Sequence, residues 1–174
     1  RYSFEHADIR DRNSLDTIFE KHKPDAVMHL AAESHVDRSI DAPADFIETN
    51  ITGTFNMLEA ARTYWQAYGK HDNFRFHHVS TDEVFGSLSC DQSVQFTEET
   101  PYDPRSPYSA SKAASDFIIK SWFRTYHFPG IITNCSNNFG PCQNVEKFVP
   151  MAITKLLNNE QMGIYGNGEN IRDW

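Results

Sequence analysis

The chain has 174 residues, and its 16 lysines and arginines against 24 aspartates and glutamates give a net charge of −8. Hydrophobic residues make up 39% and charged residues 23%, which is typical of a globular domain and unlike disordered or collagen-like chains. No apolar run is long enough to cross a membrane, and an acidic chain without a run of lysines and arginines is poorly suited to nucleic acid. We therefore expect neither a membrane nor a nucleic-acid partner.

Apolar, β-prone segments alternate with helical patterns along the chain. The patterns predict a strand at 2–8, a helix at 11–22, a strand at 25–32, a helix from 43 to about 68, a strand at 74–81, a surface loop at 87–107, a helix at 109–127, a strand at 130–135, a helix at about 147–159 and a short strand near 163–165. The segment 25–32 is apolar almost throughout, so we expect a central strand covered on both faces. This alternation predicts an α/β fold with a Rossmann-like, doubly wound parallel sheet.

Three predicted strands are followed by small and polar residues, at Leu30–His35, Ser80–Glu83 and Asn134–Asn138. Parallel sheets bind ligands beyond the carboxyl ends of their strands, so we expect these segments to converge on one crevice. The three cysteines show no zinc-ligand spacing, and we interpret them as free thiols of a cytoplasmic protein. His77 and His78 lie within a predicted strand with no metal-ligand spacing nearby, so we expect no metal site.

Tyr108 and Lys112 are four residues apart near the start of a predicted helix, so they share one helix face. A nearby ammonium favours the phenolate, which lowers the pKa of the tyrosine and prepares it to act as a base. The same spacing arises by chance in amphipathic helices, so a catalytic interpretation depends on the residues that surround the pair. The strand before the long loop ends in Ser80 and Thr81, whose hydroxyls we expect to bridge to Tyr108 and to a substrate oxygen.

Thr81, Tyr108 and Lys112 resemble the Thr-Tyr-Lys triad of the extended short-chain dehydrogenases/reductases, which act on nucleotide sugars with NAD. The resemblance is strongest to the nucleotide-sugar 4,6-dehydratases of that family that act on dTDP-glucose. It extends over essentially the whole chain and rests on five ordered segments: LAAESHVDRSI at 30–40, FHHVSTDEVFG at 76–86, SPYSASKAASD at 106–116, TNCSNNFGP at 133–141 and YGNGENIRDW at 165–174.

The resemblance implies dehydration of dTDP-glucose to dTDP-4-keto-6-deoxyglucose. Tyr108 would take the proton of the sugar 4-hydroxyl while the C4 hydrogen passes to NAD. Glu83 would then remove the C5 proton, and Asp82 would protonate the departing 6-hydroxyl, before the hydrogen returns to C6. Adjacent carboxylates suit a reaction that needs both a base and an acid. A solvated acidic turn is the alternative interpretation of Asp82 and Glu83 alone.

Other positions receive roles only through the resemblance. The residues that match the cofactor site are Asp8, Ile9, Leu30, Ala31, Ala32, Glu33, Ser34, Thr49 and Asn138, together with Tyr108 and Lys112. Those that match the substrate site are Ser34, Thr81, Asn137, Glu146, Lys147, Phe148, Gly163, Ile164, Tyr165 and Arg172. The chain departs from the family pattern at Val145, Phe148 and Gly163, which affects contacts on the nucleotide side.

The resemblance also places the glycine-rich, pyrophosphate-binding turn before Arg1 and the rest of the substrate lobe after Trp174. We therefore expect an internal piece of a longer enzyme, with a partial NAD-binding domain at 1–143 and the start of a substrate-binding portion at 144–174. By itself, this piece is expected to bind NAD poorly and to be inactive. The complete enzyme is expected to be a homodimer formed through the helices at 43–68 and 109–127. The alternatives are a related UDP- or CDP-sugar dehydratase or epimerase, and an inactive fragment.

Overall fold

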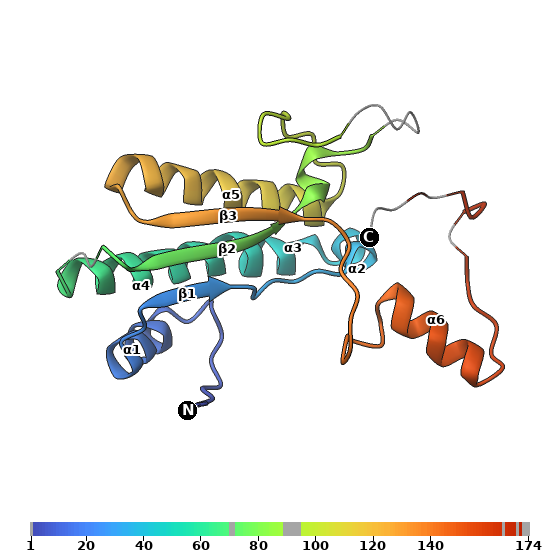
Figure 1. The fold of residues 1–174 in the computed structure, drawn as a ribbon, viewed down its shortest axis with the longest axis horizontal. Helices are drawn as coiled ribbons and strands as arrows, with labels where there is room; N and C mark the ends of the chain where they lie inside the picture. The colour runs from blue at the N-terminus through green and yellow to red at the C-terminus, as the bar shows by residue number, and fades with distance from the viewer. Residues whose placement is uncertain (1, 70–71, 89–94, 165, 170, 172–174) are drawn as a thin grey trace.

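The computed structural model describes residues 2–69, 72–88, 95–164, 166–169 and 171, and contains a three-stranded parallel sheet (Figure 1). The strands follow the order β1-β2-β3, with Met28 paired to His77 and Thr81 paired to Cys135. Their bounds are β1 (Ala26–His29), β2 (Arg75–Thr81) and β3 (Gly130–Cys135). The α-helices are α1 (Arg12–His22), α2 (Val36–Asp41), α3 (Pro43–Phe46), α4 (Thr54–Ala67), α5 (Pro107–Tyr126) and α6 (Phe148–Leu157). The predicted α/β fold with a parallel, Rossmann-like sheet is confirmed.

Local capping explains where two of these helices begin. Asp11 caps α1, because its side chain accepts hydrogen bonds from the backbone N–H groups of Asn13 and Ser14. Ser106 caps α5 in a reciprocal arrangement with Ser109, and Pro107 occupies the first turn. This cap starts α5 two residues before the predicted 109 and places Tyr108 in its first turn.

The single helix predicted from 43 to 68 is interrupted. A π-helix, η1 (Ile47–Gly53), connects α3 to α4. The Ser115 hydroxyl of α5 donates a hydrogen bond to the backbone carbonyl of Asn50 in this segment. The wider turn thus keeps a backbone carbonyl in contact with a neighbouring helix, and such π segments often lie at functional sites.

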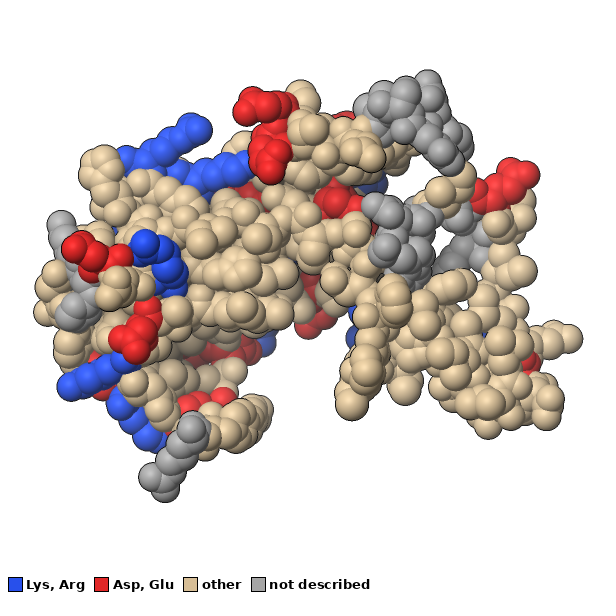
Figure 2. Space-filling view, viewed as in Figure 1, with Lys and Arg blue, Asp and Glu red and all other residues tan. Residues whose placement is uncertain are grey.

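The core lies on one face of the sheet. Phe76 of β2 packs there with Leu58 and Trp65 of α4, Ile119 of α5 and Phe128, and α1 adds to the same cluster. On the opposite face Met28 is 63% and Ile131 49% exposed. Seen from the side on which the strands lie in front of α4, the middle of the molecule carries few charged side chains (Figures 1 and 2). The expectation that 25–32 is a central strand covered on both faces is wrong for the described sheet, because β1 lies at its edge and β2 at its centre.

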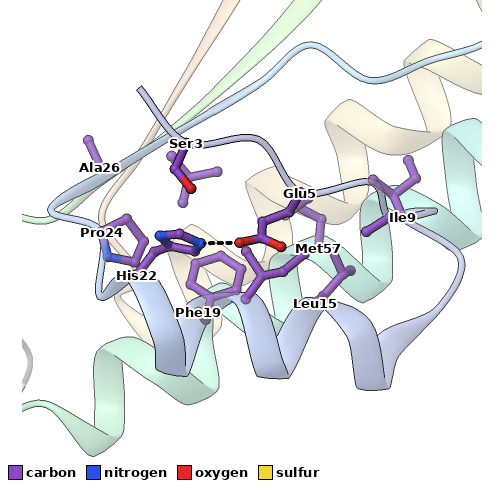
Figure 3. A pocket seen from close by; sticks show the side chains of 12 residues that line it. Ser3, Glu5, Ile9, Leu15, Phe19, His22, Pro24, Ala26 and Met57 are labelled. Atoms are coloured by element: carbon purple, nitrogen blue, oxygen red, sulfur yellow. Dashed lines mark hydrogen bonds and ion pairs between the residues drawn. The ribbon is translucent and has the colours of Figure 1, made fainter. Parts of the chain in front are cut away.

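Two predicted strands are absent from the described residues. Residues 2–8 form no strand, and Tyr2 and Phe4 are exposed, because no described strand lies beside them to complete a hydrogen-bonded ladder. This segment instead runs past α1, with an apolar pocket of about 410 Å³ between them (Figure 3). His22 Nε2 lies 2.7 Å from Glu5 Oε1 across that pocket. Gly163 and Ile164 also form no strand, and Tyr165 lies outside the described residues.

No described helix is both long and apolar enough to cross a membrane.

Candidate active site

Tyr108 and Thr81 form the centre of the candidate site. Thr81 is the last residue of β2, and its side chain interacts with Tyr108 at the start of α5. The Tyr108 ring packs edge-on against Phe46 of α3, with 6.4 Å between the ring centroids. The ring contact with Phe46 thus positions the phenol beside Thr81, beyond the end of the sheet.

The electrostatic environment of Tyr108 differs from the predicted one. Burial and then the carboxylate of Glu83 raise the pKa of Tyr108 to about 12, although the side chain of Thr81 acts in the opposite direction. The expectation that Lys112 lowers this pKa is therefore wrong. Helical spacing places two residues on the same face, but it contains no information about how deeply the phenol is buried or which carboxylates surround it.

Lys112 is buried and bound to the sheet. Its Nζ atom donates a hydrogen bond to the Val79 carbonyl of β2 at 2.9 Å and lies 3.4 Å from His78 Nε2. Burial lowers the pKa of Lys112, whereas Asp116 acts to raise it. The ammonium is thus fixed against β2, one helical turn beyond Tyr108.

The paired carboxylates follow directly from Thr81. Asp82 and Glu83 begin a short 3-10 helix, η2 (Asp82–Phe85). Thr81 Oγ1 accepts a hydrogen bond from the Glu83 backbone N–H at 3.2 Å and donates to Asp82 Oδ1 at 3.3 Å. Ser80, by contrast, donates to Asp116 at 2.9 Å, so its hydroxyl is directed to that carboxylate, whereas Thr81 interacts with Tyr108.

Several residues predicted to hold the cofactor surround one pocket of about 340 Å³ at the end of the sheet. The predicted cofactor residues in its lining are Asp8, Ile9, Ala31, Glu33 and Thr49. Arg10 forms an ion pair with Asp8 at 2.7 Å, and its hydrogen bonds lower the pKa of Asp8 to about 2. This edge of the pocket therefore carries a fixed carboxylate.

Asn50 fixes the loop that follows β1. Its Oδ1 atom accepts a hydrogen bond from the Glu33 backbone N–H at 2.8 Å, and its Nδ2 atom donates to the Glu33 carbonyl at 3.0 Å. The same Nδ2 atom donates to Ser111 Oγ at 2.8 Å. One buried amide thus connects the predicted cofactor loop to the helix that carries Tyr108 and Lys112.

Two polar contacts connect this loop region to the residues before α6. Lys147 Nζ donates to Ser34 Oγ at 3.4 Å, and Arg38 pairs with Glu146 at 3.1 Å. In Figure 1, α6 lies apart from the sheet, near its carboxyl end. These contacts bring three of the predicted substrate residues, namely Ser34, Glu146 and Lys147, to the same region.

The remaining residues predicted for the cofactor and substrate sites lie in several separate segments of the chain. Asn138 donates to the Ser136 carbonyl at 3.0 Å and so stabilises the turn after β3, where Asn137 also lies. Leu30, Phe148 and Ile164 are exposed. The others are Ala32, Gly163, Tyr165 and Arg172, of which the last two lie outside the described residues.

Sequence reasoning missed three buried residues of this region: Asn50, His78 and Asp116. A signal existed for Asp116, because it follows Lys112 by four residues and so shares its helix face. His78 follows Phe76 by two residues and so shares its face of the strand, where a buried polar side chain must find a partner, whereas Asn50 stands among polar neighbours and gave no such signal. Within the described part of the chain, no group of three or more histidines, cysteines, aspartates and glutamates is placed to hold a metal ion.

A parallel α/β sheet, with a tyrosine beside a strand-end threonine and a buried lysine one turn after that tyrosine, defines the short-chain dehydrogenase/reductase class. Within it, the chain belongs to the family described as GDP-mannose 4,6 dehydratase, whose model matches residues 1–174.

The chain is similar over its full length to proteins named dTDP-glucose 4,6-dehydratase. It is 57% identical to the dTDP-glucose 4,6-dehydratase of Salmonella typhimurium over 183 residues, which cover 100% of this chain and 51% of the relative. The crystal structure of the dTDP-glucose 4,6-dehydratase DesIV from Streptomyces venezuelae, with NAD bound, matches with a TM-score of 0.87 and 44% identity, over 98% of this chain and 49% of that chain. A Thermus thermophilus UDP-glucose 4-epimerase with NAD matches with a TM-score of 0.79 at 25% identity, over 91% of this chain and 49% of that chain. The chain spans about half the length of these relatives.

Proposed function

We propose that the complete protein is an NAD-dependent hydro-lyase that converts dTDP-glucose to dTDP-4-keto-6-deoxyglucose, in deoxysugar biosynthesis. The observation that carries this proposal is that Thr81 and the adjacent carboxylates Asp82 and Glu83 all lie close enough to Tyr108 to act on it. An elimination of water that is coupled to oxidation of the sugar needs an acid, a base and a tyrosine that takes a proton during the oxidation, and these groups lie together here. The 57% identity to a dTDP-glucose 4,6-dehydratase supports the same assignment.

The residues around the 340 Å³ pocket fit a dinucleotide. Asp8 presents an ionised carboxylate at its edge, suited to hydroxyl or amino groups at the adenosine end, and Ala31 is small enough to allow close approach of a ligand. We propose that Asp8, Ile9, Leu30–Ser34, Thr49 and Asn138 hold NAD together with Tyr108 and Lys112. When bound, NAD⁺ supplies reversible two-electron oxidation of the sugar and a positively charged ring that favours the phenolate.

The chemistry of the chain's own side chains follows from their positions. Tyr108, held by Thr81, exchanges a proton with the sugar 4-hydroxyl. A ketone at C4 acidifies the hydrogen at C5, which Glu83 removes as a base. Asp82 donates a proton to the 6-hydroxyl, and water leaves. Lys112, fixed on β2, supplies positive charge on the same helix face as Tyr108.

We propose that residues 1–143 belong to the NAD-binding domain and that 144–174 begin the substrate-binding portion. In this assignment Ser34, Thr81, Asn137, Glu146, Lys147, Phe148, Gly163, Ile164, Tyr165 and Arg172 contact the nucleotide sugar. The Lys147–Ser34 and Arg38–Glu146 contacts support a substrate site between the sheet end and the residues before α6. A lysine and an arginine there suit the substrate's diphosphate.

We further propose a cytoplasmic homodimer. The free thiols of Cys135 and Cys142 support a reducing compartment. Phe55 of α4 and Phe117 of α5 are 39% and 58% exposed, which supports an interface on these two helices.

The nucleotide preference is tested by incubating the full-length protein with dTDP-, UDP-, CDP- and GDP-linked hexoses at equal concentration. We expect a 4-keto-6-deoxy product, measured by its alkaline absorbance and mass, at least tenfold faster from dTDP-glucose. A 4-keto-6-deoxy product formed only from another nucleotide sugar would contradict the dTDP assignment but would still agree with the proposed reaction class. A C4-epimer without loss of water would contradict the reaction class itself.

A further inference from the structure

A buried carboxylate, Asp116, lies one helical turn beyond Lys112 on α5 and has no role in the mechanism above. Its side chain is 0% exposed. Its Oδ2 atom accepts hydrogen bonds from Ser80 Oγ at 2.9 Å, from the Tyr102 hydroxyl at 2.9 Å and from Asn134 Nδ2 at 3.3 Å. These donors come from β2, from the loop before α5 and from β3. One carboxylate therefore joins both neighbouring strand ends to the helix of the catalytic tyrosine.

The other carboxylate oxygen of Asp116, Oδ1, is separated from Lys112 by the ring of His78. His78 Nε2 lies 3.3 Å from Asp116 Oδ1 and 3.4 Å from Lys112 Nζ. Burial lowers the pKa of His78, so its ring is neutral at pH 7. The Lys112 ammonium and the Asp116 carboxylate are then the two opposite charges of this buried group. Buried charges are tolerated only when they are paired and hydrogen-bonded.

The other titratable groups around Lys112 do not replace this carboxylate. His29 of β1 lies with its ring centroid 5.2 Å from that of His78, and burial lowers its pKa to about 3, so it is neutral. Cys135 at the end of β3 acts on Lys112 in the same direction as Asp116 but less strongly. Asp116 is thus the main group that offsets the effect of burial on the Lys112 ammonium.

We infer that Asp116 is a positioning residue, the buried counterion that keeps Lys112 charged and fixed against β2 beside the Thr81–Tyr108 pair. The catalytic importance of this arrangement rests on the proposed function, whereas the charge pairing is a property of the chain alone. Asp116 also anchors the loop before α5, because the Tyr102 hydroxyl donates a hydrogen bond to it and accepts one from Lys120 at 2.9 Å.

The test compares Asp116→Asn with wild type in the full-length protein without added ligand. Asparagine has nearly the same size but removes the charge, so the pKa of Lys112 is expected to fall by about 1 to 3 pH units. It is measured from the ¹³C shift of the lysine ε-carbon, assigned with Lys112→Arg. The alkaline limb of kcat/KM for dTDP-glucose is expected to move to lower pH in the same variant.

Tyr102→Phe is the matched control, because it removes one hydrogen bond to Asp116 and leaves the charge in place. The Lys112 pKa is expected to stay unchanged in this control, which separates a charge effect from loosened packing. An unchanged Lys112 pKa in Asp116→Asn would overturn the inference. A wild-type Lys112 that is neutral at pH 7 would also overturn it, and this second measurement does not require the variant to fold. If the pKa falls in a protein without dehydratase activity, the pairing stands and the proposed function fails.

Discussion

Replacing Tyr108 with phenylalanine is expected to lower kcat of the full-length protein on dTDP-glucose by about 10²- to 10⁴-fold. The substitution removes the phenolic hydroxyl beside Thr81, and it leaves the ring packed against Phe46. The proton of the 4-hydroxyl then has no acceptor, while the fold retains its contacts. Steady-state kinetics and the midpoint of thermal unfolding measure the two effects separately.

Tyr126→Phe serves as the control for this experiment. Tyr126 lies in the last turn of the same helix and is 39% exposed, with its ring packed against Trp122. Its substitution is expected to leave kcat within twofold of wild type. A Tyr108→Phe variant with kcat close to that of wild type would contradict the assignment of Tyr108 as the acid–base group.

Replacing Glu83 with glutamine is expected to abolish proton exchange at C5 of the sugar. Wild-type protein acting in D₂O should give a product with deuterium at C5, because that position loses and regains a proton. Glutamine keeps the shape of Glu83 but cannot act as a base, so product formation should fall by about 10²- to 10⁴-fold. Mass spectrometry and NMR of the sugar measure the incorporated deuterium.

The control is Glu99→Gln, which removes an exposed carboxylate from the loop between η2 and α5. Its deuterium incorporation is expected to equal that of wild type. Normal exchange at C5 in the Glu83→Gln variant would assign the base to another residue, and the paired carboxylates would then be better explained as a solvated turn.

Local sequence patterns predicted well where individual helices and strands begin and end. The strand Gly130–Cys135 matches its prediction at both ends, and the helix predicted at 11–22 begins one residue later because Asp11 caps it. The failed strand at 2–8 has a physical reason, since strand formation requires a neighbouring strand that a local pattern cannot reveal. The edge position of β1 depends on the order of strands in the sheet, which is equally non-local.

In the candidate site, the sequence identified residues, but it did not predict properties that depend on the folded surroundings. Spacing and resemblance identified Tyr108, Lys112 and Thr81, and the structure brings Thr81 and Tyr108 into contact. The direction of the Tyr108 pKa was mispredicted, because burial and the nearby carboxylates outweigh any effect of Lys112. The role of Asp116 likewise depends on three segments that meet only in the folded chain.

We propose that one active site oxidises C4 and reduces C6 of the same sugar, and dTDP-glucose that carries deuterium at C4 tests this claim. The full-length protein is expected to yield a 4-keto-6-deoxy product with that deuterium in its C6 methyl group. Loss of the deuterium to solvent, or its retention at C4 in an epimerised sugar, would contradict the claim.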